Sequence, residues 1–150
     1  MEKQILAVPA KKVQIVAHSM GGMTVLKMLQ DSKTLAKVSQ VIMLGSPLNG
    51  CALGSLAFWE RWRNQKYLAL NSRVIKKLNS NPKINRKIQA LFSQFDGIVF
   101  PKNISKLKHA KENAELPIYG HVGLILAKKS WREILGRLTR GFGGIFLVTR

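Results

Sequence analysis

The most informative segment for the fold is residues 13–22, VQIVAHSMGG. Its first five residues form a short apolar, β-branched run, which is typical of a strand buried on both faces of a parallel sheet. A glycine pair closes the segment, and the residues from Met20 to Gln30 favour a helix. The segment therefore predicts a buried strand, a tight turn at Ser19 and a helix that starts directly after the turn.

Strand-like and helical segments alternate along the rest of the chain. Three further strand-like runs are residues 38–44, 88–92 and 116–119. The residues between the second and third runs have an irregular helical pattern. This alternation predicts one α/β domain over residues 1–150, with about four parallel strands and flanking helices.

The last helix carries the clearest sequence pattern. Ser130 and Glu133 have the spacing of a capping box, and the apolar residues that follow them repeat on one helical face. Glycines at 141, 143 and 144 are expected to end the helix and to leave an apolar tail at residues 145–148.

Composition bounds the class of protein. A length of 150 residues fits one compact domain, and 46% apolar residues argue against a disordered chain. No run approaches the roughly 18 consecutive apolar residues of a membrane span. The single cysteine, Cys51, excludes an internal disulfide framework and a cysteine-built metal cluster. The first residues have no apolar signal core, so the chain as written is expected to be cytoplasmic.

Basic residues dominate the charge. Lys and Arg number 25 against 7 acidic residues, which gives a formal charge of +18. Such a charge attracts polyanions without sequence preference, but zinc-finger, RNP-like and Walker patterns are all missing from the sequence. We therefore interpret the charge as a solvated cationic surface and expect no specific nucleic-acid partner.

Ser19 is the candidate nucleophile. An exposed nucleophilic serine between a strand and a helix requires small residues two positions before and two after it, and Ala17 and Gly21 meet that requirement. The turn places Ser19 at the positive end of the next helix, where the amide of Met20 is the natural donor to an oxyanion. A merely structural turn is the alternative.

A base and an orienting acid are needed to activate a serine, and two residues downstream are suitable. Asp96 follows the third strand-like run, and His121 follows the fourth between Gly120 and Gly123. Both lie just beyond the carboxyl ends of predicted strands, where open α/β sheets place their sites. The chain order serine, aspartate, histidine is that of α/β hydrolases. Alternatively, Asp96 forms a turn with Gly97, and His121 is an ordinary loop imidazole.

Four other residues are weaker candidates. We interpret His18 as a packing or locally hydrogen-bonded residue, His109 as part of an exposed lysine-rich loop and Cys51 as a small buried residue. Asp31 lies too close to Ser19 in sequence to complete a triad.

Four segments together resemble the carboxyl-terminal half of bacterial lipases and esterases of the α/β-hydrolase fold. They are residues 13–22, 41–50, 95–101 and 118–126. The AHSMG turn and the GHVGLI block are similar to those of small triacylglycerol lipases. The resemblance implies that Ser19 is the nucleophile, Asp96 the orienting acid and His121 the general base. It also implies that residues 52–87 take the place of a variable cap or lid.

Hydrolases of this kind have further strands before the nucleophile strand, whereas only residues 1–10 precede it here. The resemblance therefore implies a partial domain without the loop that supplies the second oxyanion amide. The nucleophile strand is then expected to form a sheet edge, which invites a homo-oligomer through that edge.

These observations predict a serine hydrolase that cleaves carboxylic esters, lipid esters above all, through an acyl-enzyme and without metal or cofactor. The apolar and basic segment 52–87 is expected to form a helical cap, with an anionic membrane surface as a further partner. A catalytically silent fragment that serves as an interaction module, and a basic nucleic-acid binder, are the alternatives.

Overall fold

The computed structural model describes residues 2–50, 72–140 and 145–149. In chain order the elements are α1 (Glu2–Ala7), β1 (Val13–His18), α2 (Met20–Met28), α3 (Ser32–Lys37), β2 (Val38–Leu44), α5 (Arg73–Asn79), α6 (Pro82–Asn85), β3 (Ile88–Phe95), the 3-10 turn η2 (Lys102–Ser105), β4 (Glu112–Tyr119), α7 (Gly123–Leu126), α8 (Lys128–Thr139) and β5 (Ile145–Thr149). In this part of the chain no helix is both long and apolar enough to cross a membrane.

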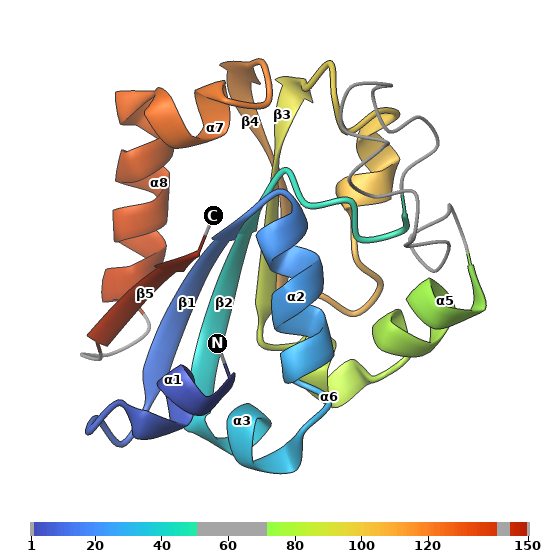
Figure 1. Ribbon diagram of the computed structural model, residues 1–150. Helices are drawn as coiled ribbons and strands as arrows, with labels where there is room; N and C mark the ends of the chain where they lie inside the picture. The colour runs from blue at the N-terminus through green and yellow to red at the C-terminus, as the bar shows by residue number, and fades with distance from the viewer. Residues whose placement is uncertain (1, 51–71, 141–144, 150) are drawn as a thin grey trace.

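The strands form one parallel sheet in the order β4-β3-β2-β1-β5. Figure 1 shows α1, α2, α3, α5 and α6 on one face of the sheet and α7 and α8 on the other. The predicted α/β class is therefore confirmed, with a fifth strand in addition to the four expected ones.

The expectation that the nucleophile strand forms a sheet edge is wrong. β5 pairs with β1 in parallel from Val13↔Ile145 to Ala17↔Thr149, so β1 is an inner strand. The apolar run at residues 145–148, expected to be a tail, forms most of this covering strand. The homo-oligomer that the sequence predicts stays a prediction, but it cannot form through an exposed edge of β1.

Two apolar layers hold the sheet between its helices. β1 alternates between them: Val13, Ile15 and Ala17 pack with the side chains of α2, whereas Val16 packs with those of α7 and α8. Strands buried on both faces need nearly continuous apolar sequence, which is why residues 13–17 and 38–44 were recognisable as strands.

The predicted capping box is also wrong. α8 begins at Lys128 with Ala127 as its N-cap, so Ser130 lies inside the helix. The Ser130 hydroxyl instead donates to the carbonyl of Leu124 in α7, and the Glu133 carboxylate accepts from Arg137. The side chain of Ser130 therefore ties α7 to α8.

Two predicted features lie partly or wholly outside the described residues. Cys51 lies outside them, and so does the first part of the proposed cap, residues 52–71. The rest of the proposed cap contains α5 and α6, whose N-caps Ser72 and Asn81 each accept a backbone N–H with the side chain.

Candidate active site

Ser19 occupies a strained turn between β1 and α2. Its backbone has φ 54° and ψ −124°, a conformation that residues other than glycine rarely adopt. The Ser19 N–H donates to the carbonyl of Leu44 at 2.8 Å, which holds the turn against the end of β2. A strained serine at a strand-to-helix turn is the geometry of a nucleophile elbow.

Close packing around Gly22 keeps this turn tight. A β-carbon at Gly22 would lie 2.2 Å from Oγ of Ser46 and 2.7 Å from its β-carbon. Only a glycine allows the first turn of α2 to approach the segment after β2 this closely. The sequence reasoning assigned the steric demand to Ala17 and Gly21 and did not predict this contact.

Asp96 and His121 form a buried pair at the carboxyl edge of the sheet. Nδ1 of His121 lies 2.9 Å from the Asp96 carboxylate, and the two residues are 7% and 8% exposed. The carboxylate also accepts the N–H groups of Ile98 and Val99, at 3.1 and 2.7 Å. Burial disfavours the charged form of Asp96, but the hydrogen bonds from His121, Val99 and Ile98 outweigh it and hold the pKa of Asp96 below its ordinary value.

Gly45 brings the pair and the serine turn to the same place. It has φ 53°, and a β-carbon there would lie 3.1 Å from Oδ2 of Asp96 and 3.3 Å from Nδ1 of His121. The preceding residue, Leu44, accepts the N–H of Ser19. The backbone of residues 44–45 therefore contacts the serine turn on one side and the pair on the other. Figure 1 shows the ends of β1, β2 and β3 at one edge of the sheet.

The hydroxyl of Ser19 and the imidazole of His121 are not hydrogen-bonded to each other in the described part of the chain. In enzymes without bound substrate such bonds are often long and tighten in the substrate complex. Met20, the expected oxyanion donor, is the first residue of α2, so its N–H has no acceptor within the helix.

His18 lies closer to the candidate site than the sequence reasoning expected. Its Nε2 is 3.2 Å from the main-chain carbonyl oxygen of His121, and the centroids of the two imidazoles are 4.5 Å apart. The hydrogen bond of His18 is therefore not the local one that was expected, because its partner is the main chain of the candidate base, 103 residues further along the chain. Sequence patterns did not reveal this partner because β1 and β4 are not neighbours in the sheet.

The remaining histidine and the early aspartate lie elsewhere. His109 is exposed in the loop between η2 and β4, with φ 61°. Asp31 is the N-cap of α3, where its carboxylate accepts from the backbone and hydroxyl of Thr34 at 2.7 and 2.9 Å. Among the described residues, no group of three or more His, Cys, Asp or Glu could hold a metal ion.

A parallel sheet with helices on both faces and a strained serine turn at its carboxyl edge defines an α/β domain of the hydrolase class. The sequence pattern of the family described as "PGAP1-like alpha/beta domain" matches residues 4–111, and the chain belongs to that family. The match includes Ser19 and Asp96 and ends before His121. No curated protein matches the chain significantly in sequence.

Proposed function

We propose that this chain is a serine hydrolase that cleaves carboxylic esters, with lipid esters as its substrate class. The observation that carries the proposal is the buried Asp96–His121 hydrogen bond at the same sheet edge as the strained turn of Ser19. Membership of an α/β-hydrolase-class family supports hydrolytic chemistry. The bond that is cleaved and the roles of individual residues are our proposal.

The lowered pKa of Asp96 sets the roles of the two imidazole nitrogens. An ionised carboxylate can only accept, so Nδ1 of His121 carries the proton of their 2.9 Å contact. In a neutral imidazole the other nitrogen, Nε2, is then without a proton. This nitrogen is the general base in the proposed mechanism, and Asp96 holds the ring in the required tautomer.

The proposed reaction has two steps, acylation of Ser19 and hydrolysis of the acyl-serine. Oγ of Ser19 attacks the ester carbonyl carbon while its proton passes to Nε2 of His121, and the N–H of Met20 donates to the resulting oxyanion. The intermediate collapses to an acyl-serine, and the alcohol leaves with the proton from His121. A water molecule then attacks the acyl-serine and gives a proton to His121, which passes that proton to the leaving Oγ of Ser19, so that the carboxylic acid and the free serine are released.

Exposed apolar side chains beside the pair support a lipid substrate. Phe95 directly precedes Asp96 in the chain, Phe100 follows it by four residues, and the two are 61% and 64% exposed. Tyr119, two residues before His121, is 72% exposed. Phe95 and Tyr119 are paired across β3 and β4. Burying such side chains against an acyl chain contributes a favourable free energy of about 25 cal/mol per Å2 of apolar surface. These three aromatic side chains therefore favour long acyl groups over short ones.

The test combines covalent labelling with turnover. A fluorophosphonate probe should label the wild-type protein at Ser19, and p-nitrophenyl esters should be hydrolysed faster as the acyl chain lengthens. The Ser19→Ala variant should lose both activities. Ser80→Ala, at an exposed serine that ends α5, is the matched control and should retain both.

Folded wild-type protein that is neither labelled nor active would overturn the proposal and favour a silent interaction module. Equal activity in the wild type and Ser19→Ala would remove Ser19 as the nucleophile. Hydrolysis confined to the shortest esters would overturn the lipid substrate class while leaving the reaction type in place.

A further inference from the structure

We infer that His18 is a positioning residue, which ties the main chain of His121 to the end of β1 and so fixes the imidazole of His121 relative to the hydroxyl of Ser19. The inference rests on the proposed function, because it assigns a second histidine to the same site. His18 is adjacent to Ser19 in the chain, so a bond from His18 to His121 joins the strand of the nucleophile directly to the loop of the base.

The direction of this hydrogen bond follows from its acceptor. A main-chain carbonyl has no proton to give, so Nε2 of His18 must be the donor in the 3.2 Å contact with the oxygen of His121. His18 therefore carries a proton on Nε2, and in its neutral form Nδ1 has none. The two imidazoles also contact each other, with ring planes inclined by 43°.

The loop that carries His121 is otherwise anchored to β3 and the residue that follows it. The N–H of Gly120 donates to the carbonyl of Phe95 at 2.7 Å, and the side chain of His121 bonds to Asp96. β3 is separated from β1 by β2. The contacts with Phe95 and Asp96 therefore orient the ring of His121. The hydrogen bond from His18 fixes the main chain of His121 relative to the strand that precedes Ser19.

His18 is suited to this role because its burial favours the uncharged form. Burial lowers the pKa of His18, the nearby His121 lowers it further, and a hydrogen bond with the His121 backbone and the charge of Asp96 act in the opposite direction. His121 and Asp96 are the titratable groups that act on His18 electrostatically. A neutral His18 places no positive charge against the imidazolium that forms on His121 during the reaction.

Two substitutions separate the hydrogen bond from the packing of the ring. His18→Phe keeps an aromatic ring and removes the donor, whereas His18→Gln keeps a donor at a similar reach and removes the ring. With a p-nitrophenyl ester, we expect His18→Phe to lower kcat by roughly 10- to 100-fold with little change in KM, since a small misplacement of a catalytic group costs about that much. His18→Gln should recover most of the lost kcat.

The matched control is His109→Asn, which removes an exposed histidine and tolerates the positive φ of that position. It should leave kcat and KM unchanged. The thermal unfolding midpoint of each variant shows whether a loss of kcat follows a loss of folding. A merely structural His18 would lower the unfolding midpoint and leave kcat per folded molecule at the wild-type value, and that result would overturn the inference.

A second measurement tests the contact without turnover. Two-dimensional 1H–15N NMR of the histidine rings reports which nitrogen carries the proton, and we expect the Nε2–H tautomer for His18 near neutral pH. His18→Phe should also shift the ring signals of His121. An Nδ1–H tautomer of His18, or unchanged His121 signals, would overturn the inference. If the wild type lacks esterase activity, the proposed function fails, and the NMR experiment still decides whether the contact exists.

Discussion

The backbone of Ser19 stores conformational energy at the proposed reaction centre. A residue other than glycine with φ 54° and ψ −124° costs of order 1–3 kcal/mol relative to an ordinary conformation. Strained residues of this kind cluster at functional sites. Here the strained conformation places the hydroxyl of Ser19 at the carboxyl edge of the sheet. The strain therefore makes Ser19 a position where stability and the proposed activity oppose each other.

Ser19→Gly and Ser19→Ala should differ in stability although both lack the nucleophile. Glycine adopts the observed φ without strain, and this gain exceeds its larger loss of chain entropy. We expect Ser19→Gly to have a free energy of unfolding about 1 kcal/mol higher than Ser19→Ala. Urea denaturation of the two variants checks this. Equal stabilities would mean that the turn relaxes in the alanine variant or is not strained in solution.

Asp96→Asn should nearly abolish turnover while leaving the protein folded. An amide in this position can donate to Nδ1 of His121 and so favour the wrong tautomer, for which a loss of about 10,000-fold in kcat is the expected scale. Asp31→Asn is the control, because asparagine is also a good N-cap for α3. Ester hydrolysis by the two variants gives the comparison, and similar kcat values would contradict the role of Asp96.

The stability that Asp96 contributes should depend on pH in a known direction. Its pKa is lower in the folded protein than its ordinary value of 3.8, so the unfolded chain binds the proton more readily. The ionised carboxylate thus stabilises the fold above its ordinary pKa, and this contribution is lost as the pH falls through the folded value. The difference in unfolding midpoint between the wild type and Asp96→Asn should shrink below about pH 4, and a constant difference would contradict the sign.

At the scale of the elements, two helical glycines have opposite surroundings. A β-carbon at Gly22 in α2 would overlap Ser46, whereas a β-carbon at Gly136 in α8 would have no heavy atom within 4 Å. The same substitution should therefore have opposite effects. The packing of α2 against the sheet, and with it the turn at Ser19, depends on Gly22 and not on Gly136.

Gly22→Ala should destabilise the protein by about 1–3 kcal/mol through overpacking, whereas Gly136→Ala should stabilise it by up to about 1 kcal/mol through helix propensity. Chemical denaturation measures both. Adding Ser46→Gly to Gly22→Ala removes the overlapping atoms and should recover part of the loss. If the two single substitutions have the same sign of effect, the contact with Ser46 is not the cause.

Elements buried on both faces were predictable from sequence, and elements whose identity depends on a distant partner were not. β1 and β2 are continuous apolar runs. β4 was predicted only for its last four residues, because the first half of this strand, Glu112–Glu115, is polar and partly exposed. β5 becomes a strand by pairing with β1, and nothing local distinguishes it from an apolar tail.

The same distinction applies to the candidate site. The places of Asp96 and His121 were predictable because Asp96 directly follows β3, His121 lies two residues after β4, and parallel strands bring their carboxyl ends to one edge. The partner of His18 was not predictable, because that contact joins the end of β1 to a loop after β4, two strands further away in the sheet than its neighbour β2. Local sequence patterns predict on which face of the sheet a side chain lies, but they do not predict which distant loop that side chain contacts.

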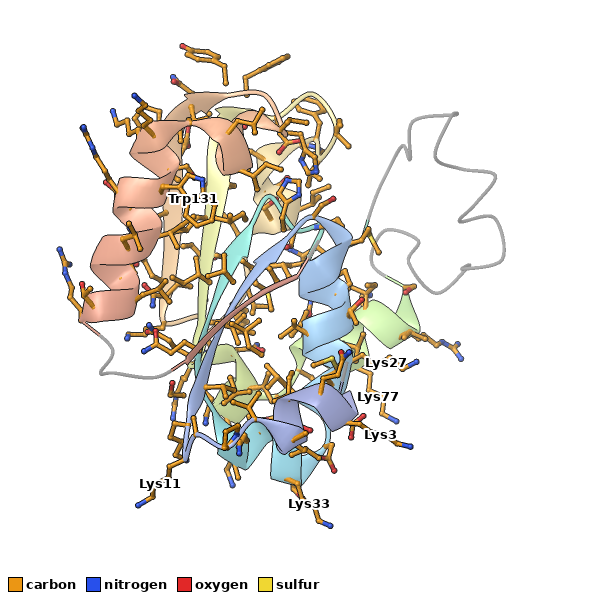
Figure 2. The ribbon with its side chains drawn as sticks, turned by 60° about the vertical axis from the view of Figure 1, so that its left-hand side comes forward. Lys3, Lys11, Lys27, Lys33, Lys77 and Trp131 are labelled. Atoms are coloured by element: carbon orange, nitrogen blue, oxygen red, sulfur yellow. The ribbon has the colours of Figure 1, made fainter. Side chains whose placement is uncertain are left out.

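At the scale of the whole molecule, several lysines lie far from the candidate site. Figure 2 shows Lys3, Lys11, Lys27, Lys33 and Lys77 at the end opposite to the carboxyl edge of the sheet. The exposed aromatic side chains Phe95, Phe100 and Tyr119 lie at that carboxyl edge. These five lysines therefore do not line the candidate site, whereas the exposed aromatic side chains at the carboxyl edge offer apolar surface near it.

The pairing of β5 with β1 should protect the main chain of β1 from pairing with another chain. β5 covers β1 from Val13 to Ala17, and its removal would leave the main-chain groups of an apolar inner strand without partners. Exposed edges of this kind pair with other chains. A chain that ends after residue 144 should therefore unfold at a lower temperature and form oligomers whose size increases with concentration. Light scattering coupled to size-exclusion chromatography of the full and shortened chains measures this. A shortened chain that stays monomeric with an unchanged unfolding midpoint would mean that β5 does not protect β1 in solution.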